Sequence, residues 1–144
     1  MMPMIEPTIG SALRGKTILI IEDDPLIRSM LCLGLRRFGH RVIAAADGIE
    51  GLALIEREVF NIDMLLTDIS LPGVRGPVLA RKALDLRPDL RVVLASGSLF
   101  PEEVAATTLF GLPFLRKPFT LESLRTFIDS SLSSQSHCMA EVAI

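Results

Sequence analysis

Polar residues that could together carry out phosphoryl transfer follow four separate runs of apolar residues. Carboxylates bind hard cations such as Mg²⁺, and a carboxylate can also accept a phosphoryl group. A hydroxyl can donate to a phosphoryl oxygen, and a lysine ammonium offsets its negative charge. The groups in question are the acidic run Glu22-Asp23-Asp24, the carboxylate of Asp68, the hydroxyl of Ser96 and the amine of Lys117. They can act together only if the fold brings them to one place.

The apolar runs themselves predict the strands that would position these groups. They are short, continuous and rich in β-branched residues, which is typical of strands buried on both faces of a parallel sheet. Pro113 interrupts the last run, which favours an edge position for that strand. We expect strands at residues 17–21, 41–45, 62–67, 90–95 and 112–115.

Helices are expected between the strands. Asp24 can cap a helix that begins at Pro25 and runs to about Phe38, where Gly39 ends it. Alternation of strands and helices with right-handed crossovers predicts a three-layer α/β sandwich, whose sites form at the carboxyl edge of the sheet. The other helices are expected after Asp47-Gly48, from Pro77 to before Pro88, from Pro101, and from Thr120 to about Leu132.

Apolar residues recur near helical spacing in three of these segments, which is typical of amphipathic helices. The residues are Leu26, Met30, Leu33 and Phe38 in the first helix, Ile49, Leu52, Ala53 and Leu54 in the second, and Leu121, Leu124, Phe127 and Ile128 in the last.

Composition restricts the class of protein. The chain has 144 residues, of which 49% are hydrophobic, so we expect one folded domain with a sizeable core. Its formal net charge of -2 does not indicate a nucleic-acid binder. Cys32 lies in an expected helix and Cys138 in a polar tail, which argues against a structural disulfide and fits a reducing cytosol. We expect a flexible arm at 1–15, the domain at 16–133 and a flexible tail at 134–144.

Targeting signals are not evident in the sequence. The first residues lack the basic start and apolar core of a signal peptide, and no apolar run approaches the roughly 18 residues that a membrane span needs. We therefore expect a cytoplasmic protein that does not contact a membrane.

The acidic residues differ in what they are expected to do. Glu22 and Asp23 are predicted metal ligands, because Asp68 should converge on them and clustered carboxylates are costly unless a cation lies among them. Asp24 is better explained as a helix cap, although a ligand role stays open. Asp63 lies at the opposite end of its strand, and we assign it no role in the site.

Asp68 is the candidate phosphoryl acceptor, although an isolated aspartate there would be read as a capping or loop residue. Ser96 could contact the phosphoryl group or simply be a turn residue. Lys117 precedes Pro118, which holds it extended towards the sheet edge, whereas an isolated lysine would be a surface residue. The sequence shows no general base and neither GxxxxGK[ST] nor GxGxxG after the first strand, which favours a phosphohistidine or acyl phosphate over ATP as donor.

Four stretches, in this order, make the chain similar to the receiver domains of two-component response regulators. They are ILIIEDDPLIR, LLTDISLPG, VVLASGS and FLRKPF. The resemblance covers residues 16–133 and implies a five-stranded parallel sheet of order 2-1-3-4-5, the flavodoxin-like arrangement.

The resemblance also implies a role for individual residues. Asp68 would be phosphorylated, and Mg²⁺ would be bound by the acidic pair Glu22 and Asp23 together with Asp68 and the backbone carbonyl of Ser70. Asp23 and Asp68 would touch the ion directly. Ser96 and Lys117 would contact the phosphoryl group, the Lys117–Pro118 bond would be cis, and Phe114 would be the aromatic residue that moves when Ser96 moves.

Some positions depart from the family pattern. Arg75 stands where the family usually has aspartate, which alters the charge near the site without removing a ligand. Ser96-Gly97 replaces the frequent Thr-Ala, and Ser70 and Ser98 are also small. We expect water to reach the phosphoryl group easily, and hence a short-lived phosphorylated state.

The function expected from this resemblance is that of a phosphorylation-activated signalling switch and not of an enzyme. A histidine kinase or a histidine phosphotransfer protein would phosphorylate it, and the surface of helix four, strand five and helix five would then change for an unknown downstream protein. A homodimer through that surface is possible. The chain would be a stand-alone receiver or part of a hybrid kinase.

Two alternatives remain open. The chain could be an interaction module that uses the fold without phosphorylation. An aspartate-nucleophile phosphatase fits less well, because such enzymes have DxDx[TV] at the first strand and Asp68-Ile69-Ser70 lacks the second aspartate.

Overall fold

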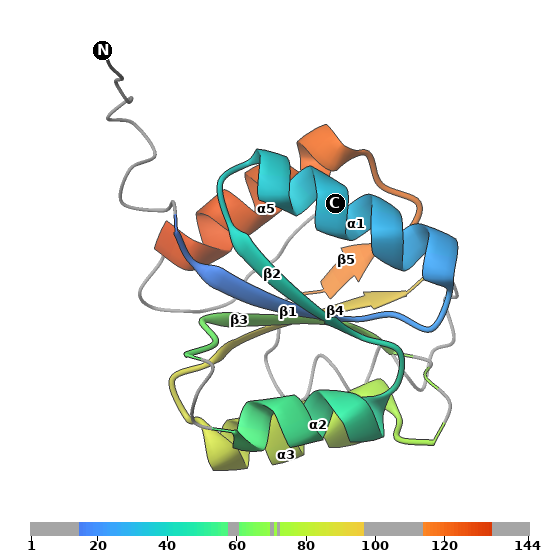
Figure 1. Cartoon of the computed structure of the whole chain (residues 1–144), viewed down its shortest axis with the longest axis vertical. Helices are drawn as coiled ribbons and strands as arrows, with labels where there is room; N and C mark the ends of the chain where they lie inside the picture. Colours follow the sequence, from blue (N-terminus) through green and yellow to red (C-terminus); the bar gives the residue numbers. More distant parts are fainter. Residues whose placement is uncertain (1–14, 58–60, 70, 72, 97–113, 134–144) are drawn as a thin grey trace.

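The predicted alternation of strands and helices forms one parallel sheet between two layers of helices. The computed structural model describes residues 15–57, 61–69, 71, 73–96 and 114–133, with only the backbone of Ser96, Phe114 and Ser133. Within them the sheet has five strands in the order β2-β1-β3-β4-β5, all paired in parallel (Figure 1). This confirms the expected fold. The strands are β1 (Thr17–Ile21), β2 (Arg41–Ala45), β3 (Met64–Asp68), β4 (Arg91–Ser96) and β5 (Phe114–Arg116).

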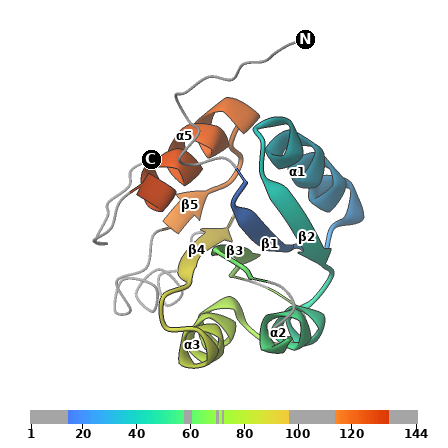
Figure 2. The ribbon, with the colours of Figure 1, turned by 60° about the vertical axis from the view of Figure 1, so that its left-hand side comes forward.

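The helices cover both faces of the sheet. Helices α1 and α5 lie on one face, and α2 and α3 lie side by side on the other, as Figures 1 and 2 show. The helix expected from Pro101 lies outside the described residues. In the described part of the chain, no helix is long and apolar enough to span a membrane. The bounds are Pro25–Arg37 for α1, Gly48–Glu56 for α2, Gly76–Leu86 for α3 and Leu121–Ser133 for α5.

The residues that begin and end the helices have the predicted roles. The Asp24 carboxylate accepts hydrogen bonds from the backbone N–H groups of Leu26 and Ile27, and α1 begins at Pro25. Gly39 follows α1 with φ of 97°, a conformation that favours glycine. Asp47 caps α2 through the N–H of Glu50.

Strand β3 begins at Met64 instead of Ile62, later than the sequence predicted, and Asp63 directly precedes it. The Asp63 carboxylate accepts a hydrogen bond of 2.8 Å from the Thr17 N–H, and its own N–H donates to the Thr17 carbonyl at 2.8 Å. Asp63 therefore joins the start of β1 to the start of β3. The sequence assigned it no role in the site, and the role it has is structural.

Alternation along the strands divides the hydrophobic core in two. Leu19 and Ile21 of β1 face the α2 and α3 side, whereas Ile18 and Ile20 face the α1 and α5 side. All of these side chains are buried. The sheet is thus fixed from both sides, which holds its carboxyl edge in place.

The buried face of α1 is not the one that the apolar spacing marked. Leu26 and Leu33 are 78% and 62% exposed, and Met30 is exposed as well, whereas Leu31 and Leu35 are buried. Phe38 packs partly against the core. In α2, Ile49 is likewise exposed and Ala53 lies at the surface, while Leu52 and Leu54 pack partly against the core. The spacing in α5 was right, since Leu124 and Ile128 are buried with Leu121 and Phe127 packed beside them.

Candidate metal and phosphoryl-acceptor site

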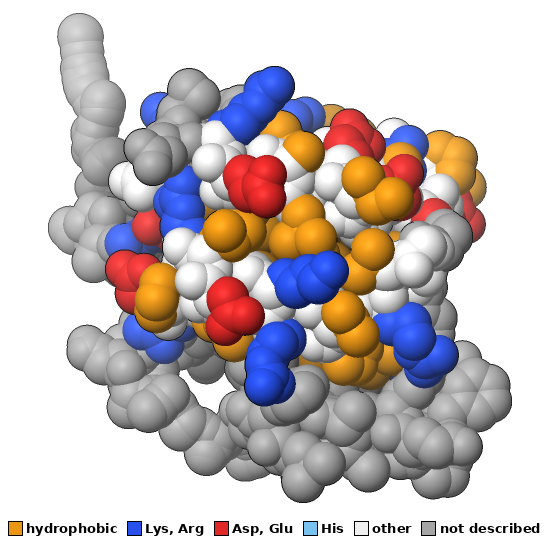
Figure 3. Space-filling model, turned by 90° about the horizontal axis from the view of Figure 1, so that it is seen from below, with side chains coloured by type: hydrophobic (Ala, Val, Ile, Leu, Met, Phe, Trp, Pro, Cys, Tyr) orange, Lys and Arg blue, Asp and Glu red, His pale blue; other side chains and the backbone are white. Residues whose placement is uncertain are grey.

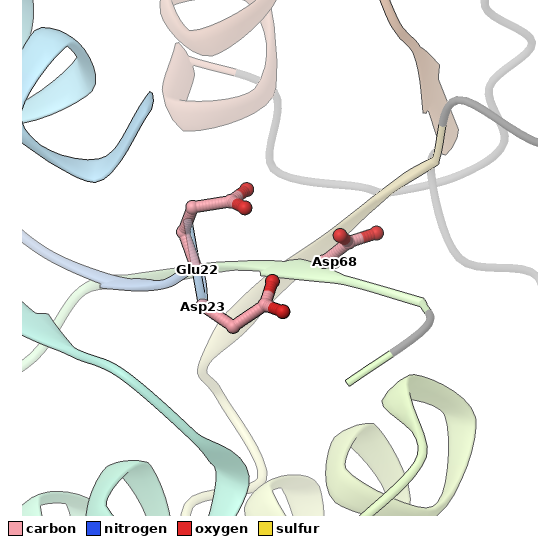
Figure 4. A group of neighbouring side chains, drawn as sticks. All are labelled: Glu22, Asp23 and Asp68. Carbon is pink, nitrogen blue, oxygen red and sulfur yellow. The ribbon is translucent and has the colours of Figure 1, made fainter. Parts of the chain in front are cut away.

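The sheet edge brings three carboxylates together. Glu22 and Asp23 directly follow β1, and Asp68 is the last residue of the adjacent strand β3. Each offers one oxygen, and these three oxygens lie within 4.8 Å of one another. Figure 4 shows the three side chains around a common space. A set of carboxylate oxygens suits a hard divalent cation such as Mg²⁺, which commonly keeps several waters besides its protein ligands.

Lys117 supplies a positive charge to this cluster from the segment after β5. Its Nζ donates to Glu22 Oε1 at 2.9 Å and lies 3.4 Å from Asp68 Oδ2. Burial by itself would lower the pKa of Lys117, but the hydrogen bond to Glu22 and the attraction of Asp68 and Glu22 outweigh it, so the pKa is raised. The amine is therefore a cation at neutral pH. The Lys117–Pro118 peptide bond is cis, as the resemblance implied.

Glu22 is the most buried of the three acids. It is 4% exposed, its Oε1 binds Lys117, and its Oε2 accepts a hydrogen bond of 3.2 Å from the Asp24 N–H. Asp23 is exposed at the edge. Glu22 is therefore held mainly by protein donors, and the exposed Asp23 is more accessible to an ion.

Asp24 is not part of the three-carboxylate cluster. Its Oδ1 accepts from Leu26 N at 2.9 Å and from Ile27 N at 3.3 Å at the start of α1. The capping interpretation favoured by the sequence is confirmed.

Arg28 is a contributor to the site that the sequence interpretation missed. From α1, its guanidinium donates a hydrogen bond of 2.8 Å to the backbone carbonyl of Glu22. This contact ties the acidic loop to the helix that follows it. Arg28 is in the ILIIEDDPLIR stretch, but a contact to a backbone carbonyl leaves no trace in residue types or spacing.

Gly76 was missed as well. A Cβ atom there would lie 2.5 Å from the Cα of Ile69 and 2.7 Å from the Asp68 carbonyl oxygen. The Gly76 N–H donates to the Ile69 carbonyl at 2.7 Å. The first turn of α3 thus packs directly on the backbone that follows Asp68. In the sequence, Gly76 is the last glycine of the LPGVRG loop, and this glycine was the feature that could have pointed to the close packing.

Ser96 and Phe114, the residues predicted to move on phosphorylation, are placed by their backbone only. Asp68 pairs with Ala95, so Ser96 stands one residue further along the same edge, and Ser96 pairs with Arg116 next to Lys117. Phe114 begins β5 opposite Leu94. Ser70, Gly97 and Ser98 lie outside the described residues. The roles predicted for the Ser96 and Phe114 side chains and for the Ser70 carbonyl stay predictions. Arg75 is exposed directly before α3.

Comparison with known proteins identifies the family. Residues 18–129 match the family described as response regulator receiver domain. The chain is 33% identical over 121 residues to the response regulator receiver protein CpdR of Brucella abortus, covering 81% of this chain and 97% of that protein. It spans much less of other curated relatives, for example 13% of the sensor kinase CckA of Brucella abortus, to which it is 32% identical.

Solved structures that resemble this chain are also receiver domains. The CheY-like receiver domain protein of Methanospirillum hungatei JF-1 superposes with a TM-score of 0.78 at 32% identity, over 83% of this chain and 94% of that one. The receiver domain of the sensor histidine kinase PA1611 of Pseudomonas aeruginosa, which has a magnesium ion coordinated in its active-site cleft, gives 0.75 at 25% identity, over 83% of this chain and 99% of that one. The chain belongs to the response regulator receiver domain family of two-component signalling systems.

Proposed function

We propose that this chain is a phosphorylation-activated switch in which Asp68 accepts the phosphoryl group. The observation that carries the proposal is the convergence of Glu22, Asp23, Asp68 and Lys117 at one sheet edge from three separate parts of the chain. Asp23, Asp68 and the carbonyl of Ser70 would hold Mg²⁺, with Glu22 beside them. The ion, when bound, would neutralise charge on the phosphoryl oxygens.

In the transfer, a carboxylate oxygen of Asp68 attacks the phosphorus atom of a phosphohistidine. The new P–O bond forms as the P–N bond breaks, and the electron pair of that bond returns to the imidazole, which takes up a proton. Lys117 already lies 3.4 Å from Asp68 Oδ2, so its ammonium can pair with a phosphoryl oxygen. The residues near Asp68 therefore position and neutralise the group, and the donor supplies the energy.

The donor we propose is a histidine kinase or a histidine phosphotransfer protein. Leu26, Met30 and Leu33 are exposed at positions i, i+4 and i+7 of α1, which begins directly after the acidic loop. A partner helix packed on this stripe would hold its phosphohistidine near Asp68. Two-component pairs of this kind act in the cytoplasm, where the free thiol of the buried Cys32 is stable.

The response we propose follows from Ser96 and Phe114. A phosphoryl oxygen would draw the Ser96 hydroxyl towards it, and Phe114 would move into the space left behind. The surface of the fourth helix, β5 and α5 would change shape for a downstream protein or a second copy. Because Gly97, Ser98 and Ser70 are small, we expect water to reach the acyl phosphate and limit its lifetime.

Phosphorylation at Asp68 can be tested with a small phosphodonor and Mg²⁺. Wild-type chain should gain one phosphoryl group by mass spectrometry, and Asp68→Asn should gain none. Asp24→Asn is the matched control, because asparagine also caps helices and Asp24 lies outside the cluster. Labelling of Asp68→Asn at another residue would overturn the assignment. A wild-type chain that binds neither phosphodonor nor beryllofluoride would instead be an interaction module.

A further inference from the structure

The face formed by α2 and α3 carries hydrophobic side chains that the core does not bury. Ile49 on α2 is 68% exposed, and Val78 and Leu86 on α3 are 48% and 45% exposed. Figure 3 looks onto this side of the molecule and shows hydrophobic side chains running across it among charged ones. An exposed apolar surface rimmed by charges is a common mark of a protein contact.

Charges of opposite sign are separated between the two helices. The charged residues of α2 are Glu50 and Glu56, both acidic and both exposed. The exposed charges of α3 are Arg81, Lys82 and Asp85, so this helix is basic on balance. Two copies of this face repel each other if α2 meets α2 and α3 meets α3. They attract each other if α2 of one copy meets α3 of the other.

The direction of the helices shows how unlike helices can meet. Both follow strands of a parallel sheet and return on the same side, so they run in the same direction (Figure 1). The start of α2 lies beside the loop that leads into α3, since a Cβ atom on Gly48 would lie 2.8 Å from Cβ of Val74, two residues before α3. A two-fold axis parallel to the helices therefore places α2 of one copy on α3 of the other, whereas an axis across the helices would pair α2 with α2.

We propose that the α2–α3 face binds a second copy of this chain around a two-fold axis parallel to these helices. Ile49 of one copy then lies opposite Val78 of the other, because both are in the first turn. Glu56, at the end of α2, lies near Lys82 and Leu86 of the second copy. Each of these contacts occurs twice.

This dimer leaves the rest of the proposed switch accessible. Helices α1 and α5 lie on the opposite face of the sheet (Figure 2), and α1 carries the exposed stripe of Leu26, Met30 and Leu33. The contact is also separate from the one expected on β5 and α5 from the sequence. A phosphodonor could thus approach Asp68 in both the monomer and the dimer.

The expected affinity is low. Two adjacent helices of 9 and 11 residues offer a face of about 15 by 20 Å, or roughly 300 Å² on each copy. The two copies together would bury about 600 Å², which is less than most specific interfaces bury and fits a weak, transient contact, so we expect a dissociation constant of about 0.1–1 mM.

Sedimentation equilibrium of the full chain, at concentrations from about 10 µM to 1 mM, tests the proposal. Wild type should show a monomer–dimer equilibrium. Ile49→Glu should remove it, and Glu56→Lys or Lys82→Glu should each weaken it by about three- to tenfold. The double variant Glu56→Lys with Lys82→Glu should recover association, because the two charges exchange places.

Two variants on the other side serve as controls. Leu26→Glu on α1 and Glu122→Lys on α5 change exposed residues of the opposite face and should leave association unchanged. The proposal is overturned if the wild type stays monomeric at the highest concentration. It is equally overturned if the α2 and α3 variants associate like wild type, or if the α5 control alone abolishes association. Labelling of Asp68 in the same variants reports separately on the phosphorylation proposal.

Discussion

At the scale of single residues, the acidic site is a balance between like charges and one cation. Glu22, Asp23 and Asp68 bring three carboxylate oxygens within 4.8 Å of one another. Lys117 contacts two of these acids and so offsets part of their repulsion. It does not contact Asp23, which leaves a net negative space for a divalent ion.

Arg28 is expected to position the acidic loop for metal binding. Replacing Arg28 with alanine removes the donor to the Glu22 carbonyl and frees the peptide that leads to Asp23. One such hydrogen bond at a half-buried position is worth about 1 kcal/mol, so Mg²⁺ affinity should fall about three- to tenfold. Isothermal titration calorimetry measures this affinity, and labelling of Asp68 at saturating Mg²⁺ should be retained.

Arg37→Ala is the matched control for Arg28→Ala. Arg37 is exposed in the last turn of the same helix, far along α1 from the acidic loop. Equal losses of Mg²⁺ affinity in the two variants would mean that the contact to the Glu22 carbonyl is not the cause, since losing a positive charge by itself favours binding of a cation. An unchanged affinity in Arg28→Ala would remove the positioning role.

Residue types could predict the side chains of the site but not the contacts to its backbone. Glu22, Asp23, Asp68 and Lys117 each end or follow an apolar run, and parallel pairing brings those ends together. Arg28 instead donates to the backbone carbonyl of Glu22, and Asp63 accepts from the backbone N–H of Thr17. A backbone group is the same in every residue type, so the sequence does not mark it as a partner. Such contacts depend on three-dimensional positions that spacing does not encode.

At the scale of elements, the start of α3 fixes the strand end that carries Asp68. Gly76→Ala places a methyl group against the backbone of Asp68 and Ile69, which has little freedom to move. We expect a loss of about 1–3 kcal/mol in the free energy of unfolding by urea. We also expect slower labelling of Asp68, because the connection after β3 must shift.

Gly34→Ala provides the comparison. The nearest atoms to a Cβ there belong to the end of the flexible Leu121 side chain, which can move, and alanine also favours a helix interior. Gly34→Ala should therefore lose less stability and label at the normal rate. Similar effects of the two substitutions would show that the start of α3 does not control the position of Asp68, the proposed acceptor.

The apolar residues of α1 show why its buried face could not be predicted. The helix carries two apolar lines, one with Leu26, Met30 and Leu33 and one with Leu31 and Leu35. Both have helical spacing, so periodicity locates the helix without choosing its face. Gly34 lies on the buried side with Leu31 and Leu35, where its lack of a side chain lets Leu121 of α5 pack closely.

At the scale of the whole molecule, the two faces of the sheet have separate surfaces. The α1 side carries an exposed apolar stripe next to the acidic site, and the α2–α3 side carries the apolar surface with opposite charges. The carboxyl edge between them holds Asp68, the proposed phosphoryl acceptor. Phosphotransfer and self-association can thus occupy different sides of one small domain.

Stability of the whole domain should depend on pH through His40, which lies between α1 and β2. His40 is 6% exposed, and its Nδ1 has no hydrogen-bond partner among the described residues. Burial lowers its pKa, and the attraction of Asp129 on α5 offsets this only in part. As the pH falls below about 6.5, the unfolded chain takes up a proton before the folded chain does.

The free energy of unfolding should therefore be level above about pH 6.5 and decline below it, until the folded pKa is reached. Urea unfolding across this range measures the slope, and His40→Gln should flatten the part that this residue causes. His137→Gln replaces the other histidine of the chain and should leave the slope unchanged. A slope that is equal in wild type and His40→Gln would show that the buried imidazole takes up its proton without opposing the fold.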